Sequence, residues 1–232
     1  NFVQTNIKWD GYYGYSCNDG VKAAYKNKTG NVAEINLMLT AMLRYAGLNA
    51  NPVLVSTRSN GIAYFPNRTA YNYVIAAVET PDGLVLLDAT DKFALPNILP
   101  TRDLNWFGRL IRKDGTSMEV NLTPKRMSRE INYLSAVIQP DGSAEGKIRR
   151  QYTDYEALEY RAKAVGANNE SFIESIENEN HAIEISDYTR ENDLVLNKPL
   201  LESFSFKDVK TSENINGKLY VSPLLFLTAT ES

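Results

Sequence analysis

Apolar residues with helical spacing mark one segment of the first half more clearly than any other. Across residues 33–46 they recur at intervals of three and four positions, which places them along one stripe of an α-helix. The members of this stripe are Ile35, Met38, Leu39, Met42 and Ala46. Leu37 and Leu43 widen the stripe, so we expect this helix to be buried on most sides. Gly47 follows directly and suits a left-handed cap.

Alternating apolar residues predict strands in the rest of the first half. The segments with this pattern are 52–57, 71–79 and 84–88. Pro81-Asp82-Gly83 separates the last two, and such a turn predicts an antiparallel hairpin. A short helix is expected over residues 20–26, before the buried helix. Residues 92–124 show no regular period, so we expect an irregular segment there.

The second half has a strand-rich pattern. A hairpin is predicted around the turn Pro140-Asp141-Gly142, and two short helices follow it. The predicted elements are strands 132–138 and 143–152, helices from 154 and over 170–177, and strands 182–185, 201–206 and 218–221. A proline and several charged residues between 125 and 129 separate the two patterns. The sequence therefore predicts an α+β protein with two domains, residues 1–125 and residues 126–232.

Composition argues against some classes of function. The chain has 232 residues, 43% of them hydrophobic, and a net charge of −3, which is ordinary for globular domains. No apolar run approaches the ~20 residues of a membrane-spanning helix, and there is no basic patch of the kind that binds nucleic acid. We therefore expect no transmembrane segment and no nucleic-acid partner. The chain starts at Asn1 without Met, and we expect further domains of the same polypeptide.

The order of elements in the first half fits one catalytic arrangement. Thiol acyl-transfer enzymes need a cysteine at a helix N-terminus, where the helix dipole stabilises its thiolate. A histidine on a neighbouring strand exchanges the proton, and an aspartate on the next strand orients that histidine. The helix after Val32, the strand around Tyr73 and the hairpin partner that ends at Asp88 have this order and spacing.

Three motifs resemble those of the transglutaminase-like superfamily. Gly30-Asn31-Val32-Ala33-Glu34 matches the Gly-x-Cys-x-Asp/Glu pattern before the helix, and Leu87-Asp88-Ala89-Thr90 matches an Asp before a small residue and Thr. The segment 72–75 matches a His followed by an apolar strand. The resemblance covers about residues 8–125. It implies a papain/transglutaminase-like core, with a helix packed on an antiparallel sheet, then a smaller β-rich domain with short helices. It also implies a periplasmic or extracellular protein of the bacterial cell envelope.

Carried over residue by residue, the resemblance gives a degenerate triad. Val32 lies at the nucleophile position, Tyr73 at the histidine position and Asp88 at the aspartate position. Valine has no ionisable group, and the unperturbed pKa of tyrosine is about 10, too high for a base near neutral pH. Losing the nucleophile or the base alone costs on the order of 10⁶ in turnover in such triads. We therefore expect no catalytic residue, cofactor or metal, and a binding or scaffolding role instead.

Two alternatives remain open at this point. In the first, Cys17 is the nucleophile of an active cysteine peptidase or transglutaminase and His181 is its base, because the chain has no other Cys or His. In the second, the degenerate cleft binds a peptide, protein or glycan, since aromatic side chains suit such ligands. The residues expected to line this cleft are Tyr12, Tyr13, Tyr15, Cys17 and Tyr71.

Overall fold

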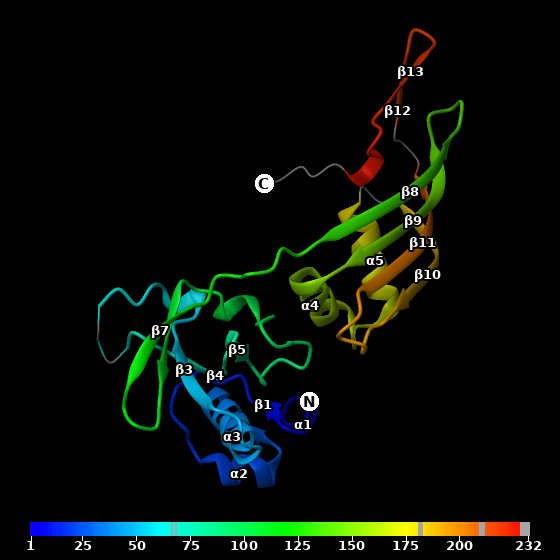
Figure 1. Cartoon of the computed structure of the whole chain (residues 1–232). Coiled ribbons are helices and arrows are strands. Elements are labelled where there is room, and N and C mark those ends of the chain that lie inside the picture. Colours follow the sequence, from blue (N-terminus) through cyan, green and yellow to red (C-terminus); the bar gives the residue numbers. More distant parts are fainter. Residues whose placement is uncertain (66, 68, 181–182, 209–211, 228–232) are drawn as a thin grey trace. The chain divides into compact units, whose positions relative to one another are not determined.

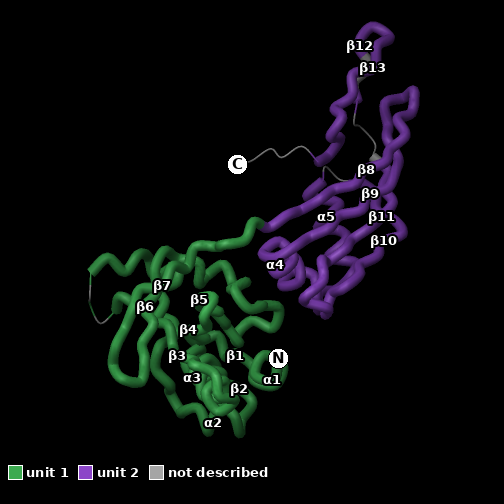
Figure 2. Tube along the Cα trace, viewed as in Figure 1, with its two compact units in different colours: residues 1–127 green, residues 128–232 purple. Residues whose placement is uncertain are grey.

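The computed structural model describes the chain from residue 1 to 232 except residues 66, 68, 181–182, 209–211 and 228–232 (Figure 1). The protein is α+β, as predicted, with antiparallel sheets and a few helices. It divides into two compact units, Asn1–Met127 and Ser128–Ser232 (Figure 2). The predicted boundary after residue 125 lies two residues before this division. No helix among the described residues is long and apolar enough to span a membrane.

Unit 1 is built on a five-stranded antiparallel sheet with the order β5-β4-β3-β6-β7. Helix α3 packs on the central strands β3 and β4, and the predicted strands 52–57, 71–79 and 84–88 correspond to β3, β4 and β5. The elements of unit 1 are α1 (Phe2–Asn6), β1 (Lys8–Trp9), α2 (Val21–Asn27), β2 (Thr29–Gly30), α3 (Val32–Tyr45), β3 (Ala50–Val55), η1 (Arg58–Asn60), β4 (Tyr73–Thr80), β5 (Gly83–Leu87), η2 (Thr101–Asp103), β6 (Phe107–Ile111) and β7 (Ser117–Asn121).

Helix α3 is more deeply buried at its N-terminal end than at its C-terminal end. Residues 31–36 are all buried, whereas Met42 and Tyr45 are exposed. The prediction of burial on most sides therefore holds only for the first turns. The reason is that α1 and α2 cover this end on the side away from the sheet, where Ile35 and Met38 join Val3 in a small apolar core.

The segment 92–124 is more regular than predicted. It contains η2 and the hairpin of β6 and β7, which extends the sheet beyond β3 through the pairs Val53↔Leu110 and Leu54↔Arg109. The turn Asp114-Gly115 joins the two strands, and Gly115 has a φ of 85°. Asp-Gly is a strong hairpin signal because glycine adopts positive φ without a steric cost. The prediction of an irregular segment was wrong because it passed over this turn.

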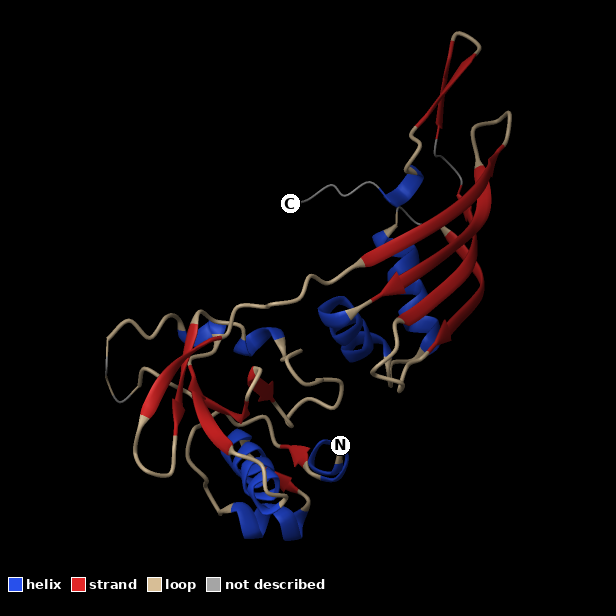
Figure 3. Ribbon diagram, in the orientation of Figure 1, coloured by secondary structure: helices blue, strands red, loops and turns tan. Residues whose placement is uncertain are grey.

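Unit 2 contains a four-stranded antiparallel sheet with the order β10-β11-β9-β8, together with a separate β12-β13 hairpin. Helices α4 and α5 pack on this sheet (Figure 3), and Ile148, Ile176 and Phe204 are part of its core. The elements are β8 (Glu130–Ile138), β9 (Ala144–Tyr152), α4 (Asp154–Ala164), α5 (Asn169–Glu179), β10 (Glu184–Glu191), β11 (Leu200–Asp208), β12 (Ser212–Ile215), β13 (Lys218–Val221) and η3 (Leu225–Leu227). The predicted strand 182–185 begins in residues outside those described.

Candidate functional site

The N-terminus of α3 is closed by a reciprocal pair of hydrogen bonds. The Asn31 side chain accepts from the backbone N–H of Glu34, and the Glu34 carboxylate accepts from the backbone N–H of Asn31, both at 2.9 Å. This capping box satisfies two of the free donors of the first turn. Val32 is the first residue of the helix and is completely buried, and its N–H donates to the carbonyl of Tyr12.

Glu34 also holds the loop that precedes α2. Its carboxylate accepts from the backbone N–H groups of Asp19 at 2.7 Å and Gly20 at 2.9 Å. Burial would raise the pKa of Glu34, but these donors outweigh it and the pKa is lowered. Gly30 is needed in the same place, because a Cβ there would lie 2.9 Å from both Ala24 Cβ and Glu34 Oε2. The residues of the Gly30–Glu34 motif that match the family therefore have structural roles here.

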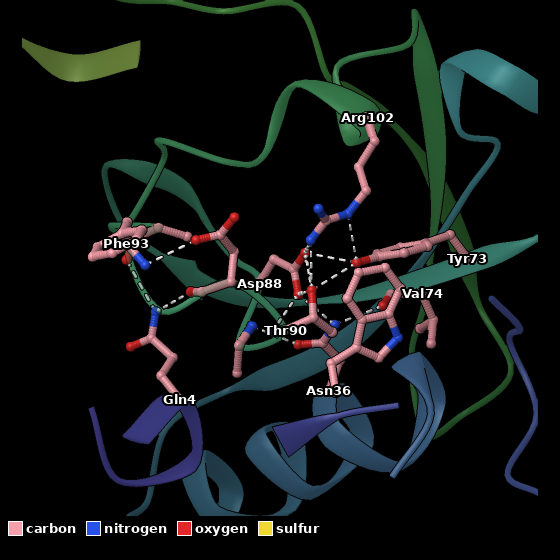
Figure 4. Close-up of polar contacts among 12 residues, drawn as sticks. Gln4, Asn36, Tyr73, Val74, Asp88, Thr90, Phe93 and Arg102 are labelled. Carbon is pink, nitrogen blue, oxygen red and sulfur yellow. Dashed lines mark hydrogen bonds and ion pairs between the residues drawn. The ribbon is translucent and has the colours of Figure 1, made fainter. Parts of the chain in front are cut away.

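Tyr73 and Asp88 meet in the interior of unit 1 (Figure 4). Tyr73 is the first residue of β4, and Asp88 directly follows β5, so the β4–β5 hairpin brings them together. The phenol O–H of Tyr73 donates to Asp88 Oδ2 at 2.9 Å and lies 2.8 Å from Thr90 Oγ1. Both Tyr73 and Asp88 are buried. Two of the three residues that the sequence predicts to form a degenerate triad are therefore in direct contact.

Further donors surround the second oxygen of Asp88. Asn36 donates to Asp88 Oδ1 at 2.8 Å, and the Thr90 backbone N–H donates to the same atom at 2.9 Å. The Asn36 side chain also donates to Val74 O and accepts from the N–H of Ala89. Asn36 thus links α3 to both strands of the hairpin, and Asp88 is held rigidly as an acceptor.

Arg102 and two aromatic rings cover this centre. Arg102 Nε donates to the Tyr73 hydroxyl at 3.2 Å, and its Nη2 lies 2.8 Å from Thr90 Oγ1 and 3.5 Å from Asp88 Oδ2. The Arg102 Cζ lies 4.8 Å from the centroid of the Trp9 ring, a cation–π distance. The Tyr13 ring packs against Tyr73 at 5.6 Å between centroids. We call Asn36, Tyr73, Asp88, Thr90 and Arg102 the Tyr73–Asp88 centre.

The phenol of Tyr73 is unsuited to proton transfer. Burial raises the pKa of Tyr73 well above its ordinary value, and the nearby Asp88 carboxylate raises it further. Its O–H is already donated to Asp88, and its oxygen already accepts from Arg102. The Tyr73–Asp88 centre instead stabilises the buried Asp88 carboxylate through its hydrogen bonds and the positive charge of Arg102.

Asp103 places a second carboxyl group beside Asp88. It is completely buried and, within the part of the chain that the structure describes, its two oxygens accept no hydrogen bond. Burial raises the pKa of Asp103 well above its ordinary value, and the neighbouring Asp88 carboxylate raises it further. Both effects favour the protonated form of Asp103.

The residues predicted to line a cleft do not gather at the Tyr73–Asp88 centre as a group. Tyr13 contacts Tyr73, but the Tyr12 side chain is largely exposed, and Tyr15 is also exposed. Tyr71 is half-buried in the loop before β4. Val32 and Tyr73 are both completely buried, so neither side chain is accessible to a ligand in solvent.

Cys17 lies in an environment that disfavours its thiolate. Burial raises the pKa of Cys17, and the nearby Glu34 carboxylate raises it further, against a weaker opposing contribution from the backbone N–H of Val21. A reactive thiol needs the opposite environment, with a lowered pKa. His181, the predicted alternative base, lies outside the described residues. Among the described residues no group of three or more His, Cys, Asp or Glu side chains could hold a metal ion.

The sequence prediction missed three members of this region. Asn36 had a usable signal, because it is a polar residue between Ile35 and Leu37 in a helix predicted to be buried. Arg102 and Asp103 had none, since two charged residues in a segment without periodicity are usually exposed. A comparison with models of protein families, with curated proteins and with solved structures found no match to this chain.

Proposed function

We propose that this chain is a non-catalytic protein with a binding or scaffolding role in the bacterial cell envelope, and that unit 1 is a transglutaminase-like domain with a degenerate triad. The observations that carry the proposal are the hydrogen bond from Tyr73 to Asp88 and the complete burial of Val32. The envelope location comes from the family resemblance. The packing of α3 on the antiparallel sheet supports the fold assignment.

The chemistry of the three positions supports a role without catalysis. Acyl transfer needs a nucleophile and a base that can give up and take a proton. Val32 supplies no nucleophile, and Tyr73 has a raised pKa and a fully engaged hydroxyl. Asp88, which would orient a histidine, instead accepts from Asn36, Thr90 and Tyr73. These side chains stabilise the fold.

The alternative of an active enzyme with Cys17 as nucleophile has less support. The raised pKa of Cys17 opposes thiolate formation near neutral pH. The alternative of a ligand in the degenerate cleft is also weakened, because Val32, Tyr73 and Asp88 are all buried. A binding role therefore points to another part of the surface.

Activity assays test the proposal directly. The wild type and Cys17→Ala would be incubated with glutamine-containing peptides plus an amine, and separately with a mixed peptidase substrate library. We expect no turnover above background from either protein. Turnover by the wild type that Cys17→Ala abolishes would overturn the proposal and establish the first alternative.

Rebuilding the triad tests the transglutaminase-like assignment by itself. In a Cys17→Ala background, Val32→Cys provides a single thiol, and Tyr73→His adds a base. If the positions correspond to a thiol triad, the pKa of this thiol should fall below about 8.5 when Tyr73→His is also present. The ultraviolet absorbance of the thiolate as a function of pH measures it. An unchanged thiol pKa with and without Tyr73→His would contradict the assignment.

A further inference from the structure

Three aromatic side chains that are not part of the Tyr73–Asp88 centre form an exposed cluster on unit 1. Tyr64 and Phe65 lie in the loop between η1 and β4, and Trp106 directly precedes β6. Their side chains are 68%, 77% and 43% exposed, respectively. We call these three residues the aromatic platform. Contiguous apolar surface of this kind marks interaction sites on soluble proteins.

The backbone at Trp106 is strained. Trp106 has a φ of 59°, in the left-handed region that bulky side chains rarely adopt. Its carbonyl accepts from Leu122 N–H at 2.9 Å, and the adjacent Asn105 side chain donates to the carbonyls of Ser56 and Gly61. These bonds tie the two loops of the platform together. A strained residue held in this way with an exposed ring indicates a functional requirement.

The rings make a continuous tilted surface with no slot between them. Tyr64 and Trp106 are 5.0 Å apart between centroids and inclined at 45°, and Tyr64 and Phe65 are 6.4 Å apart at 41°. A ring inserted between two aromatic faces needs a separation of about 7 Å, twice the contact distance of carbon atoms. A prolyl ring therefore does not fit between these side chains. The surface suits a ligand that lies flat on it.

The platform carries no charge of its own. Neither the stretch 59–65 nor the stretch 104–108 contains an acidic or basic residue. Arg58 flanks the first stretch, and its Nε donates to the carbonyl of Leu104 at 3.0 Å. Arg109 directly follows the second stretch, and its Nε donates to Ser117 Oγ at 3.1 Å. Nucleic acids and anionic membranes are recognised by clusters of Lys and Arg, which these two stretches lack. The expected ligand is therefore neutral.

We propose that the aromatic platform binds a neutral oligosaccharide, a proposal that rests on the binding role proposed above and gives it a ligand class. The C–H face of a pyranose ring is flat, apolar and uncharged, and it stacks on aromatic rings. Within the described residues, the indole N–H of Trp106 and the hydroxyl of Tyr64 have no hydrogen-bond partner, so they are available to sugar hydroxyl groups. Rings that are apolar on the face and polar at one edge suit such amphipathic ligands.

Calorimetric titration with defined oligosaccharides tests this proposal. The probes are cello-, malto-, manno-, xylo- and chitohexaose, each raised to about 5 mM to detect a Kd near 1 mM. We expect at least one to bind the wild type, with a loss of about tenfold or more in affinity on Trp106→Gly. Glycine is compatible with the positive φ at this position, so this variant removes the ring without disturbing the backbone. Tyr64→Ala should also weaken binding, and Tyr45→Ala, which removes a still more exposed ring on α3, should not.

Several outcomes would overturn the proposal. They are the absence of binding by all five oligosaccharides, or binding that Trp106→Gly leaves unchanged. Binding of a polyproline peptide instead, or self-association in sedimentation that Trp106→Gly abolishes, would assign the platform to a protein partner. None of these results produces Cys17-dependent turnover, so the failure of this proposal is distinguishable from failure of the non-catalytic role. Far-ultraviolet circular dichroism of each variant confirms that it is folded.

Discussion

Both units of this protein bury a carboxylate that accepts from tyrosine and lies near an arginine, and the comparison shows what such a buried charge requires. In unit 1, Asp88 accepts from Tyr73 and lies 3.5 Å from Arg102. In unit 2, Glu202 accepts from Tyr152 at 3.3 Å and from Tyr160, and lies 3.6 Å from Arg150.

The unit 2 cluster has no resemblance to a catalytic site. The hydroxyl of Tyr160 lies 3.0 Å from the hydroxyl of Tyr188, and burial raises the pKa of Tyr188 to about 12. Glu202 is the third residue of β11 and contacts Tyr160 of α4. A buried carboxylate costs several kcal/mol unless it is paired and hydrogen-bonded, and phenols and a guanidinium meet that need here.

The difference between the two clusters lies in their other donors. Asp88 accepts from Asn36 and from the backbone of Thr90 on one oxygen. Among the described residues, the groups that contact the Glu202 carboxylate are side chains of β9 and of α4. The phenol of Tyr73 donates to Asp88 as the phenol of Tyr160 donates to Glu202. A backbone donor therefore distinguishes the surroundings of Asp88 from those of Glu202.

The largest effect is expected from removing each carboxylate. Asp88→Ala removes the carboxylate that pairs with Arg102 and accepts from the Asn36 amide, and we expect a loss of about 3–5 kcal/mol in the free energy of unfolding of unit 1. Glu202→Ala should destabilise unit 2 by a similar or smaller amount, on the order of 3 kcal/mol. Both tryptophans, Trp9 and Trp106, lie in unit 1, so urea unfolding followed by tryptophan fluorescence reports on that unit and circular dichroism on both.

Exposed carboxylates serve as controls for these variants. Glu119→Ala on β7 and Glu184→Ala on β10 remove carboxyl groups from exposed positions, and each should change stability by less than about 0.5 kcal/mol. If Asp88→Ala lowered the stability of unit 1 as little as its control, while Glu202→Ala strongly destabilised unit 2, the Tyr73–Asp88 centre would not stabilise the fold. The comparison between the two clusters would then fail.

A pH dependence specific to unit 1 follows from Asp103. Its pKa is raised in the folded state, so the folded protein holds a proton that the unfolded chain releases above about pH 4. The stabilisation is therefore fully present below that pH and is lost as the pH rises toward the folded pKa, at no more than about 1.4 kcal/mol per pH unit. The groups that act on this carboxyl are Asp88, Asp91, Arg102 and Tyr73.

Asp103→Asn isolates this contribution. The amide keeps the shape of the side chain but cannot ionise, so unit 1 of the variant should be more stable than the wild type at pH 8 and show a flatter profile. Urea unfolding followed by tryptophan fluorescence from pH 4 to about pH 9 measures both profiles, and their difference cancels the contribution of every other titrating group. Parallel profiles would show that the pKa of Asp103 is not raised in the folded protein.

The elements of this structure that have a local sequence pattern were predictable from the sequence. The stripe of α3 and the turn Pro81-Asp82-Gly83 gave the helix and the β4–β5 hairpin, and the hairpin in turn places Tyr73 beside Asp88. Arg102 and Asp103 were not predictable, because they reach the centre through tertiary packing of η2, which leaves no periodic signal. The exposed end of α3 was missed because spacing alone does not tell which part of a stripe is covered.

The smallest and most direct comparison removes one hydroxyl from each cluster. Tyr73→Phe takes a donor from Asp88 and an acceptor from Arg102, and Tyr160→Phe takes a donor from Glu202 and a partner from Tyr188. Each should cost about 1–3 kcal/mol, because a buried charged group loses a hydrogen bond while the ring stays in place. Urea unfolding measures both, and Tyr133→Phe, with its exposed ring on β8, should be neutral.

Similar losses in the two variants would mean that Tyr73 serves as a structural phenol, as Tyr160 does. If Tyr73→Phe were neutral while Tyr160→Phe was costly, the hydroxyl of Tyr73 would contribute nothing to the fold. Its contacts with Asp88, Thr90 and Arg102 would then require a role in chemistry or recognition, contrary to the structural role assigned to the Tyr73–Asp88 centre. The ratio of the two losses in stability therefore decides whether the Tyr73–Asp88 centre stabilises the fold or serves a function of its own.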